Sequence, residues 1–188
     1  MIHEDFFLGL DLSTQSITAA VISLSEGATH RFSIFFDEEY PTYRTRDGVL
    51  FGETPSEVFA DPRMWAEALD GMLLLLKNHG LTGSISAVGV SAQQHGTVYL
   101  NSSFQERLRS LDSSLPYHEQ IRHGFSRDLS PVWMDSSTWE ECTEITQALG
   151  GHEEVARLTG SMATERFAGP QIRKFWKTHP EKYEKTVH

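Results

Sequence analysis

The chain has 188 residues and carries 16 Lys and Arg against 26 Asp and Glu, a formal net charge of −10. Its 39% hydrophobic and 11% aromatic residues exclude a disordered tail and predict one globular domain over residues 1–188. The acidic balance argues against a nucleic-acid partner, because phosphate neutralisation needs clustered cations. No apolar run approaches the ~20 residues that span a bilayer, so we expect a cytoplasmic protein with no membrane partner.

The basic residues gather at one end of the chain. Residues 1–165 carry 10 basic and 24 acidic side chains, whereas residues 166–188 carry 6 basic and 2 acidic ones. We interpret the basic tail as the solvated face of a terminal helix, with an anion contact as the alternative. Cys142 is the single cysteine, so neither an internal disulfide nor a cysteine-rich zinc site is expected.

Apolar runs predict the strands of the first half. Residues 6–10 form a continuous apolar run that is typical of a buried strand. Residues 17–22 and 32–36 follow after short turns, which together predict a three-stranded antiparallel meander. Residues 40–53 are predicted to be loop, with a short extended piece at residues 49–51.

One helix is predicted to follow this loop. Asp61 is a plausible N-cap, Pro62 occupies the first helical position, and Gly80 ends the helix. Its apolar side chains recur at helical spacing and define one buried face: Trp65, Leu69, Met72 and Leu76. Residues 84–90 then predict another buried strand, which ends in the polar cluster of residues 91–96.

Helices dominate the second half. Residues 101–127 are polar and weakly periodic, which predicts an excursion with one short helix. Helices are expected over residues 137–149, 153–158 and 171–178, with Gly150-Gly151 as a breaker and Pro180 opening a last piece. From periodicity alone the fold class is α/β with one sheet.

The turn after the first strand, Asp11 to Ser16, has the residue types of a phosphate site. A carboxylate at a strand end can hold water bound to Mg²⁺, since this ion keeps several waters and takes few carboxylates. The backbone N–H groups and hydroxyls of the turn can donate to phosphate oxygens. The alternative is an ordinary hairpin in which Asp11 caps its own turn.

Two further clusters are suited to binding hydroxyl groups or oxyanions. Gln94 and His95 follow the strand predicted at residues 84–90, and their side chains can hydrogen-bond neighbouring hydroxyls of a sugar. Arg166 precedes the helix predicted at residues 171–178 and can donate to adjacent ligand oxygens. The alternatives are a polar loop with a satisfied histidine and a surface salt bridge.

Several other nucleotide and catalytic motifs are absent. The sequence has no GxGxxG and no Walker A motif, which excludes Rossmann and P-loop nucleotide sites. Residues 89–93 resemble a nucleophile elbow around Ser91, but Gln93 stands where the second glycine belongs. A hydrolase that uses Ser91 is therefore a poor alternative.

Four segments together resemble the N-terminal domain of the FGGY carbohydrate kinase family, and within it the xylulokinase-like subgroup. The segments, in chain order, are residues 8–16, residues 91–99, residues 125–126 with 130–138, and residues 158–160 with 165–172. The resemblance covers almost the whole chain. It implies a ribonuclease-H-like fold of the actin–hexokinase type, in which an antiparallel meander is extended by parallel strands joined through helices.

The resemblance also implies an ATP- and Mg²⁺-dependent kinase with a pentulose such as D-xylulose as its small-molecule substrate. Asp11 matches the family residue that serves Mg²⁺, through water, and the ATP phosphates. The turn around it consists of Ser13, Thr14 and Gln15. The positions that match sugar contacts are Gln94, His95 and Arg166. We expect the phosphate turn and the sugar contacts to open onto a shared crevice.

Two positions depart from the family pattern, because Ser13 and Ala92 stand where glycine is usual. In the family the general-base Asp lies in a later segment and the adenine site mostly in a second domain. We therefore expect residues 1–188 to form an incomplete first domain that is inactive alone and self-associates through uncovered sheet surface. An inactive sugar-binding or regulatory module of the same fold is the alternative.

Overall fold

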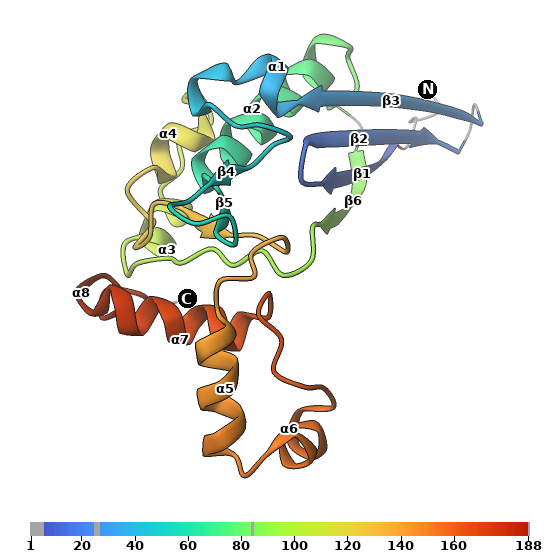
Figure 1. Ribbon diagram of the computed structural model, residues 1–188. Helices are drawn as coiled ribbons and strands as arrows, with labels where there is room; N and C mark the ends of the chain where they lie inside the picture. The colour runs from blue at the N-terminus through green and yellow to red at the C-terminus, as the bar shows by residue number, and fades with distance from the viewer. Residues whose placement is uncertain (1–5, 25–26, 84, 188) are drawn as a thin grey trace. The chain divides into compact units, whose positions relative to one another are not determined.

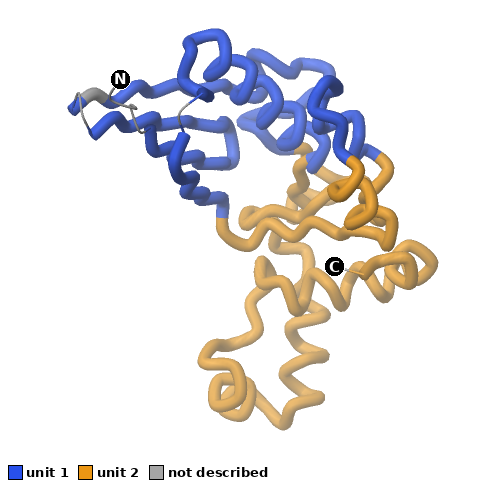
Figure 2. The backbone as a smooth tube through the Cα atoms, turned by 180° about the vertical axis from the view of Figure 1, so that it is seen from behind, with its two compact units in different colours: residues 1–49, 61–93, 111–122 blue, residues 50–60, 94–110, 123–188 orange. Residues whose placement is uncertain are grey.

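The computed structural model describes residues 6–24, 27–83 and 85–187. The protein divides into two compact units, each built from separate stretches of the chain (Figure 2). Unit 1 comprises residues 1–49, 61–93 and 111–122, and unit 2 comprises residues 50–60, 94–110 and 123–188. No helix in the described ranges has the length and apolar character needed to cross a membrane.

Unit 1 contains a four-stranded sheet with the order β3-β2-β1-β6 (Figure 1). Its strands are β1 (Phe6–Leu12), β2 (Ser16–Ser23), β3 (Ala28–Phe35) and β6 (Ile85–Ala92). The first three strands pair antiparallel, which confirms the predicted meander, and β6 pairs parallel to β1. The helix α1 (Phe36–Glu39) begins directly after β3 and is followed by the 3-10 turn η1 (Pro41–Tyr43).

The prediction that β6 is a buried strand is wrong. Val88 is 56% exposed and Val90 is 73% exposed, and Ser84 of the predicted range lies outside the described residues. The long helix of unit 1 packs against β2 and β3. β6 lies at the edge of the sheet, where it pairs with β1 and with no second strand in the described part of the chain. In β1, burial is confined to Phe6 and Leu8.

That long helix, α2 (Pro62–Asn78), forms for the reasons that the sequence suggests. Asp61 Oδ1 accepts a hydrogen bond from the Arg63 amide at 2.9 Å, which caps the helix. The apolar face is buried at Trp65, Met72 and Leu76. A short helix, α4 (Tyr117–Ile121), packs on α2.

Unit 2 contains a second sheet, so the prediction of a single sheet is wrong. Its strands are β4 (Leu50–Phe51), β5 (Val58–Ala60) and β7 (Ser130–Pro131), in the order β4-β5-β7. Strands of two or three residues are too short to show a period of two. The helices of this unit are α3 (Phe104–Arg109), α5 (Trp139–Ala148), α6 (His152–Thr159), α7 (Ala168–Thr178) and α8 (Pro180–Tyr183). The polar excursion thus holds two short helices, α3 and α4, rather than one.

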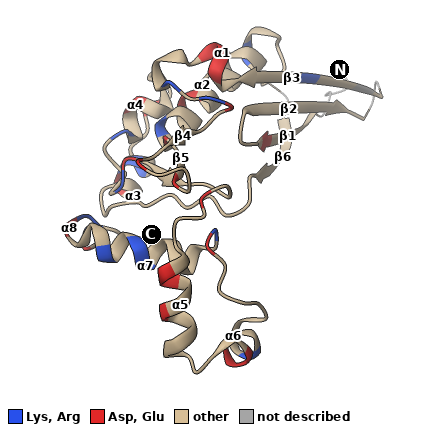
Figure 3. Cartoon of the chain, in the orientation of Figure 1, with Lys and Arg blue, Asp and Glu red and all other residues tan. Residues whose placement is uncertain are grey.

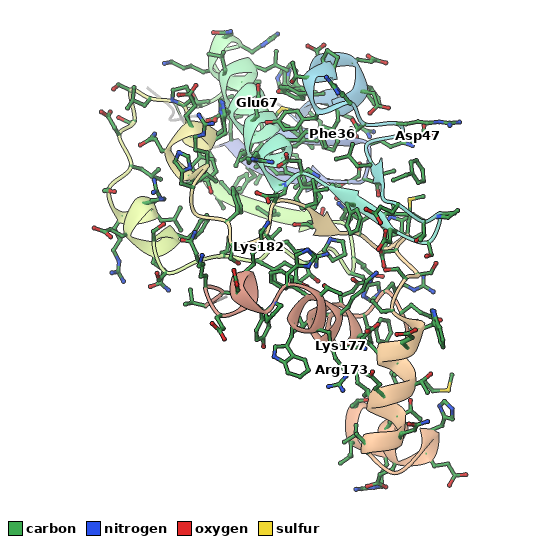
Figure 4. The ribbon with its side chains drawn as sticks, turned by 60° about the vertical axis from the view of Figure 1, so that its left-hand side comes forward. Phe36, Asp47, Glu67, Arg173, Lys177 and Lys182 are labelled. Atoms are coloured by element: carbon green, nitrogen blue, oxygen red, sulfur yellow. The ribbon has the colours of Figure 1, made fainter. Side chains whose placement is uncertain are left out.

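Most cations of the basic tail lie at the solvated surface, as predicted, and several of them also form ion pairs. Figure 3 shows the Lys and Arg residues on α7 and α8 and Asp and Glu residues on α5. On α7, Arg173 pairs with Glu144 at 2.6 Å, and Lys177 pairs with both Glu144 and Glu141 of α5 at 2.8 Å (Figure 4). Two more pairs complete the set, Lys174–Glu57 and Lys182–Asp128. Four of the six tail cations are therefore neutralised within unit 2.

Candidate functional site

The β1–β2 turn is closed by Ser13 and Ser16. The Ser13 amide donates to the Ser16 carbonyl oxygen at 2.9 Å, and Ser13 Oγ donates to the same oxygen at 3.0 Å. Ser13 is not among the residues with positive φ, so a serine in place of the usual family glycine carries no backbone strain. Thr14 and Gln15 form the tip of the turn.

Three segments distant in sequence hold this tip in place. The Phe36 amide donates to the Gln15 carbonyl oxygen at 3.0 Å. The Gln93 amide donates to the Leu12 carbonyl oxygen at 2.9 Å, and Thr14 Oγ1 donates to Gln93 Oε1 at 3.4 Å. Gln93 was not predicted to belong to the turn, although its place in the polar cluster after β6 is the signal that points to it.

The third segment is a tight turn at Asp47 and Gly48, which sequence reasoning also missed. Arg46 and Val49 exchange two backbone hydrogen bonds around them, with φ values of 55° at Asp47 and 77° at Gly48. Asp-Gly is the dipeptide that such a two-residue hairpin favours, so the signal was present. A Cβ atom on Gly48 would lie 2.0 Å from the Thr14 carbonyl oxygen, which shows how closely the two backbones approach.

Asp11 lies near the end of β1, between Thr18 of β2 and Ser91 of β6 in the register of the sheet. Ser91 Oγ donates to Asp11 Oδ1 at 2.5 Å. Among the described residues no amide of the turn donates to this carboxylate, so the alternative of a self-capped turn is wrong. Ser91 bonds to a carboxylate and to no described histidine, so the serine–histidine pair that activates most serine hydrolases is not formed here.

The surroundings of Asp11 suit a hydrated cation. The carboxylate borders an open depression on the sheet whose other walls include Gly9, Ala20 and Gly89, small residues that leave room for a ligand. No group of three or more His, Cys, Asp or Glu side chains in the described ranges is arranged to ligate a metal directly. A lone exposed carboxylate with one oxygen unoccupied fits Mg²⁺ that keeps most of its waters.

His95, in unit 2, is placed by stacking. Its ring lies 4.9 Å from the ring of Phe167 at an interplanar angle of 29°. Its φ of 57° is in the left-handed region, which is uncommon outside glycine and often marks functional positions. Neither ring nitrogen bonds to a described residue, so both remain available to a ligand. Phe167 was missed from the sequence, where its signal is an aromatic residue directly after Arg166.

Arg166 is exposed and has no ion-pair partner among the described residues, so the alternative of a surface salt bridge is wrong. Gln94 is likewise exposed, and its side-chain amide forms no hydrogen bond within the described part of the chain. Through Phe167, the structure brings His95 and the segment of Arg166 together in unit 2.

The predicted site residues thus fall into two clusters. The phosphate cluster, in unit 1, consists of Asp11, Ser13, Thr14 and Gln15, and the hydroxyl-binding cluster, in unit 2, consists of Gln94, His95 and Arg166. The chain passes from one unit to the other at the Gln93–Gln94 peptide bond.

The sequence relatives of the chain are sugar kinases. Xylulose kinase 2 of Arabidopsis thaliana is 43% identical over 185 residues, which cover 97% of this chain and 33% of that protein. D-xylulose kinase A of Aspergillus niger is 40% identical over 181 residues, which cover 96% of this chain and 32% of that protein. The chain therefore spans about one third of the length of these relatives. No family model matches the chain.

Solved structures give the same result for the fold. A xyloylose kinase from Brucella ovis matches with a TM-score of 0.70 and 18% identity over 96% of this chain and 30% of that one. Xylulose kinase from Rhodospirillum rubrum matches with a TM-score of 0.68 and 17% identity over 96% of this chain and 31% of that one. Glycerol kinase from Plasmodium falciparum has a TM-score of 0.63 and 17% identity over 97% of this chain and 30% of that one.

These matches show the fold of the chain, which is that of a part of the xylulose and glycerol kinases just named. In sequence, 96–97% of the chain is similar to about one third of the xylulose kinases of Arabidopsis thaliana and Aspergillus niger.

Proposed function

We propose that this chain forms the N-terminal part of an ATP-dependent kinase that transfers the γ-phosphoryl group of ATP to D-xylulose or a related ketose. The observation that carries the proposal is the unpaired state of Arg166 and His95. Four of the six cations in residues 166–188 are matched with carboxylates, whereas Arg166, in the hydroxyl-binding cluster, is exposed and has no ion-pair partner in the described part of the chain. Polar groups left unpaired by the protein are the ones that a sugar can engage.

In the proposed reaction, the two clusters serve the two substrates. Gln94, His95 and Arg166 would hydrogen-bond the sugar hydroxyls and orient the acceptor, which is most of what a protein contributes to phosphoryl transfer. The amide and the hydroxyl of Ser13 already bond to Ser16, so its part would be to form the turn. Thr14 and Gln15 at the tip would then face the phosphates.

Asp11 would hold Mg²⁺ through water, and the ion would neutralise charge on the ATP phosphates. The protein would need a general base and an adenine site from segments outside residues 1–188, as the family resemblance implies. We therefore propose that residues 1–188 alone do not catalyse phosphoryl transfer.

The test uses the full-length protein that contains this chain, in an ADP-release assay with D-xylulose. We expect His95→Ala to raise the KM for the sugar about tenfold or more, the value of one hydrogen bond of about 1.4 kcal/mol, and to leave the KM for ATP unchanged. Equal loss of both would show that His95 is structural. Sugar-dependent ADP release by residues 1–188 would contradict the proposed inactivity of this part.

Measurements on the same proteins distinguish the kinase from the alternative, a sugar-binding or regulatory module. Such a module would bind D-xylulose in calorimetry and release no ADP in the full-length form.

A further inference from the structure

Two buried polar side chains bond to the main chain directly ahead of Arg166, and a third, Asp135, bonds to one of them. Thr138 Oγ1 donates to the Glu165 carbonyl oxygen at 2.6 Å, and Gln171 Nε2 donates to the same oxygen at 3.1 Å. Gln171 Nε2 also donates to Asp135 Oδ1 at 2.7 Å. The exposed fractions are 1% for Asp135, 0% for Thr138 and 2% for Gln171, so water does not compete for these bonds.

Asp135 anchors this network to the rest of unit 2. Its Oδ2 accepts a hydrogen bond from the Val58 amide of β5 at 3.0 Å. Its Oδ1 accepts hydrogen bonds from the amide and the hydroxyl of Ser137, at 3.0 and 2.7 Å. A buried carboxylate is costly unless its oxygens are satisfied, and here both of them are. The network therefore has a fixed geometry and not a choice of partners.

Gln171 also acts on the other side of Arg166. Its backbone amide donates to the Phe167 carbonyl oxygen at 3.3 Å, in the first turn of α7. One residue thus bonds to the carbonyl groups on both sides of Arg166, that of Glu165 through its side chain and that of Phe167 through its main chain. Because peptide groups are planar, fixing the Glu165 carbonyl orients the peptide that carries the Arg166 nitrogen and Cα. The next peptide is held by its Phe167 amide, which donates to the Thr164 carbonyl oxygen at 2.9 Å.

The same segment places His95. Phe167 occupies the N-cap position of α7 and supplies the ring on which the His95 imidazole stacks. A displacement of residues 165–167 would therefore move the guanidinium of Arg166 and the wall behind His95 together. Apolar side chains at these positions would stabilise the packing equally well, but they would not fix the backbone through directional hydrogen bonds. The buried polar network is therefore explained by the backbone geometry that it specifies.

We propose that Gln171 and Thr138 are positioning residues of the sugar site, which hold Arg166 and Phe167 and, through Phe167, the ring of His95. This inference rests on the proposed function for its consequence in catalysis. The claim that Thr138 and Gln171 hold Arg166, Phe167 and the His95 ring concerns only contacts within unit 2, and it can be tested without the kinase activity.

The structural test is NMR of the His95 ring in the 188-residue chain, with its resonances assigned by their loss in His95→Asn. The stacked Phe167 ring shifts these resonances, so we expect Thr138→Val and Gln171→Leu to move them toward values of an unstacked histidine. The matched control is Thr146→Val. Thr146 is also a buried threonine of unit 2, but its hydroxyl donates to the Cys142 carbonyl oxygen at 2.8 Å within α5. This control should leave the His95 resonances unchanged.

The functional test measures the same variants in the full-length protein. We expect Thr138→Val and Gln171→Leu to raise the KM for D-xylulose about tenfold or more, since a misplacement of about 1 Å can cost 10²-fold. The KM for ATP and the kinetics of Thr146→Val should stay unchanged. Thr138→Val nearly conserves the volume of the side chain, so we expect this variant to fold. It keeps the test valid if Gln171→Leu does not fold.

The outcomes separate the two hypotheses. Unchanged His95 resonances in both variants would overturn the positioning role, whatever the kinetics. Shifted resonances with an unchanged KM for the sugar would overturn it as well. A full-length wild-type protein without sugar-dependent ADP release would instead refute the proposed function, and the NMR result would still decide whether Thr138 and Gln171 hold the segment.

Discussion

Gly48 shows how strongly the β1–β2 turn, the predicted phosphate site, depends on a single residue outside it. Its backbone lies against Thr14, and any side chain there would meet the Thr14 carbonyl oxygen. The positive φ of 77° adds a conformational cost for every residue except glycine. The candidate site residues were visible in the sequence because they are polar and lie at the ends of predicted strands or, for Arg166, ahead of a predicted helix. Gly48 carries no chemistry, and its contact with Thr14 joins positions far apart in the chain.

We predict that Gly48→Ala lowers the free energy of unfolding by about 2–5 kcal/mol. This is the sum of the cost of placing alanine in the left-handed region and the cost of an overpacked contact. The measurement is urea unfolding of the 188-residue chain. Gly80→Ala is the matched control, because Gly80 has a φ of 71° but no atom within 4 Å of its added Cβ. It should cost only about 1–2 kcal/mol. Equal losses for the two variants would contradict the close approach to Thr14.

Asp37 acts at the scale of elements, because it joins α1 to the turn that carries Gly48. Its carboxylate accepts hydrogen bonds from Thr45 Oγ1 and the Asp47 amide, both at 2.6 Å, and from the Gly48 amide at 3.1 Å. Burial opposes ionisation, but these hydrogen bonds outweigh it and hold the pKa of Asp37 below its ordinary value of 3.8. The charged form therefore stabilises the position of the turn.

A carboxyl group with a lowered pKa in the folded state contributes stability above its unfolded pKa, and this contribution is lost as the pH falls through the folded pKa. We predict that Asp37→Asn lowers the free energy of unfolding at pH 7 and weakens its decline below about pH 4. Urea unfolding at a series of pH values measures both effects. Thr45→Val, which removes one of the hydrogen bonds, should give an intermediate curve. A curve for Asp37→Asn parallel to that of wild type would refute this role.

The length of elements decided which of them were predictable. α2 has seventeen residues, a capping aspartate and a periodic apolar face, and the prediction matched it within two residues. The short extended piece predicted at residues 49–51 matches β4, whereas β5 and β7, of three and two residues, were not predicted. β7 pairs with β5, which is distant in sequence, so no local pattern indicates that pair. The contacts of Thr138 and Gln171 with Glu165 are likewise not indicated by any local sequence pattern.

At the scale of the whole chain, β6 is the least protected element of the described structure. A strand with an unpaired edge and exposed apolar side chains invites pairing with another chain. The sequence suggested burial because an apolar, β-branched run is typical of an interior strand. Whether such a run is covered depends on which elements pack over it, and α2 packs over β2 and β3 instead.

We predict that the 188-residue chain self-associates through β6, and that Val90→Lys shifts it toward the monomer. Size-exclusion chromatography with light scattering over a range of concentrations measures this equilibrium. Leu74→Lys is the control, since Leu74 is 58% exposed on α2 and its substitution places the same charge away from the sheet. Monomeric elution of the wild-type chain at low micromolar concentration would disprove the prediction.

The sequence by itself determined the meander, the long helix, the breaks between helices and the resemblance of the motifs to those of the FGGY carbohydrate kinases. These features depend on periodicity, on caps and on short motifs, which are properties of neighbouring residues. Only the tertiary structure decided that four of the six tail cations are paired, that Arg166 and His95 bond to none of the described residues, and that Gly48 and Gln93 hold the β1–β2 turn. Those properties arise from contacts between residues far apart in the chain, whose partners are chosen by packing and not by local sequence.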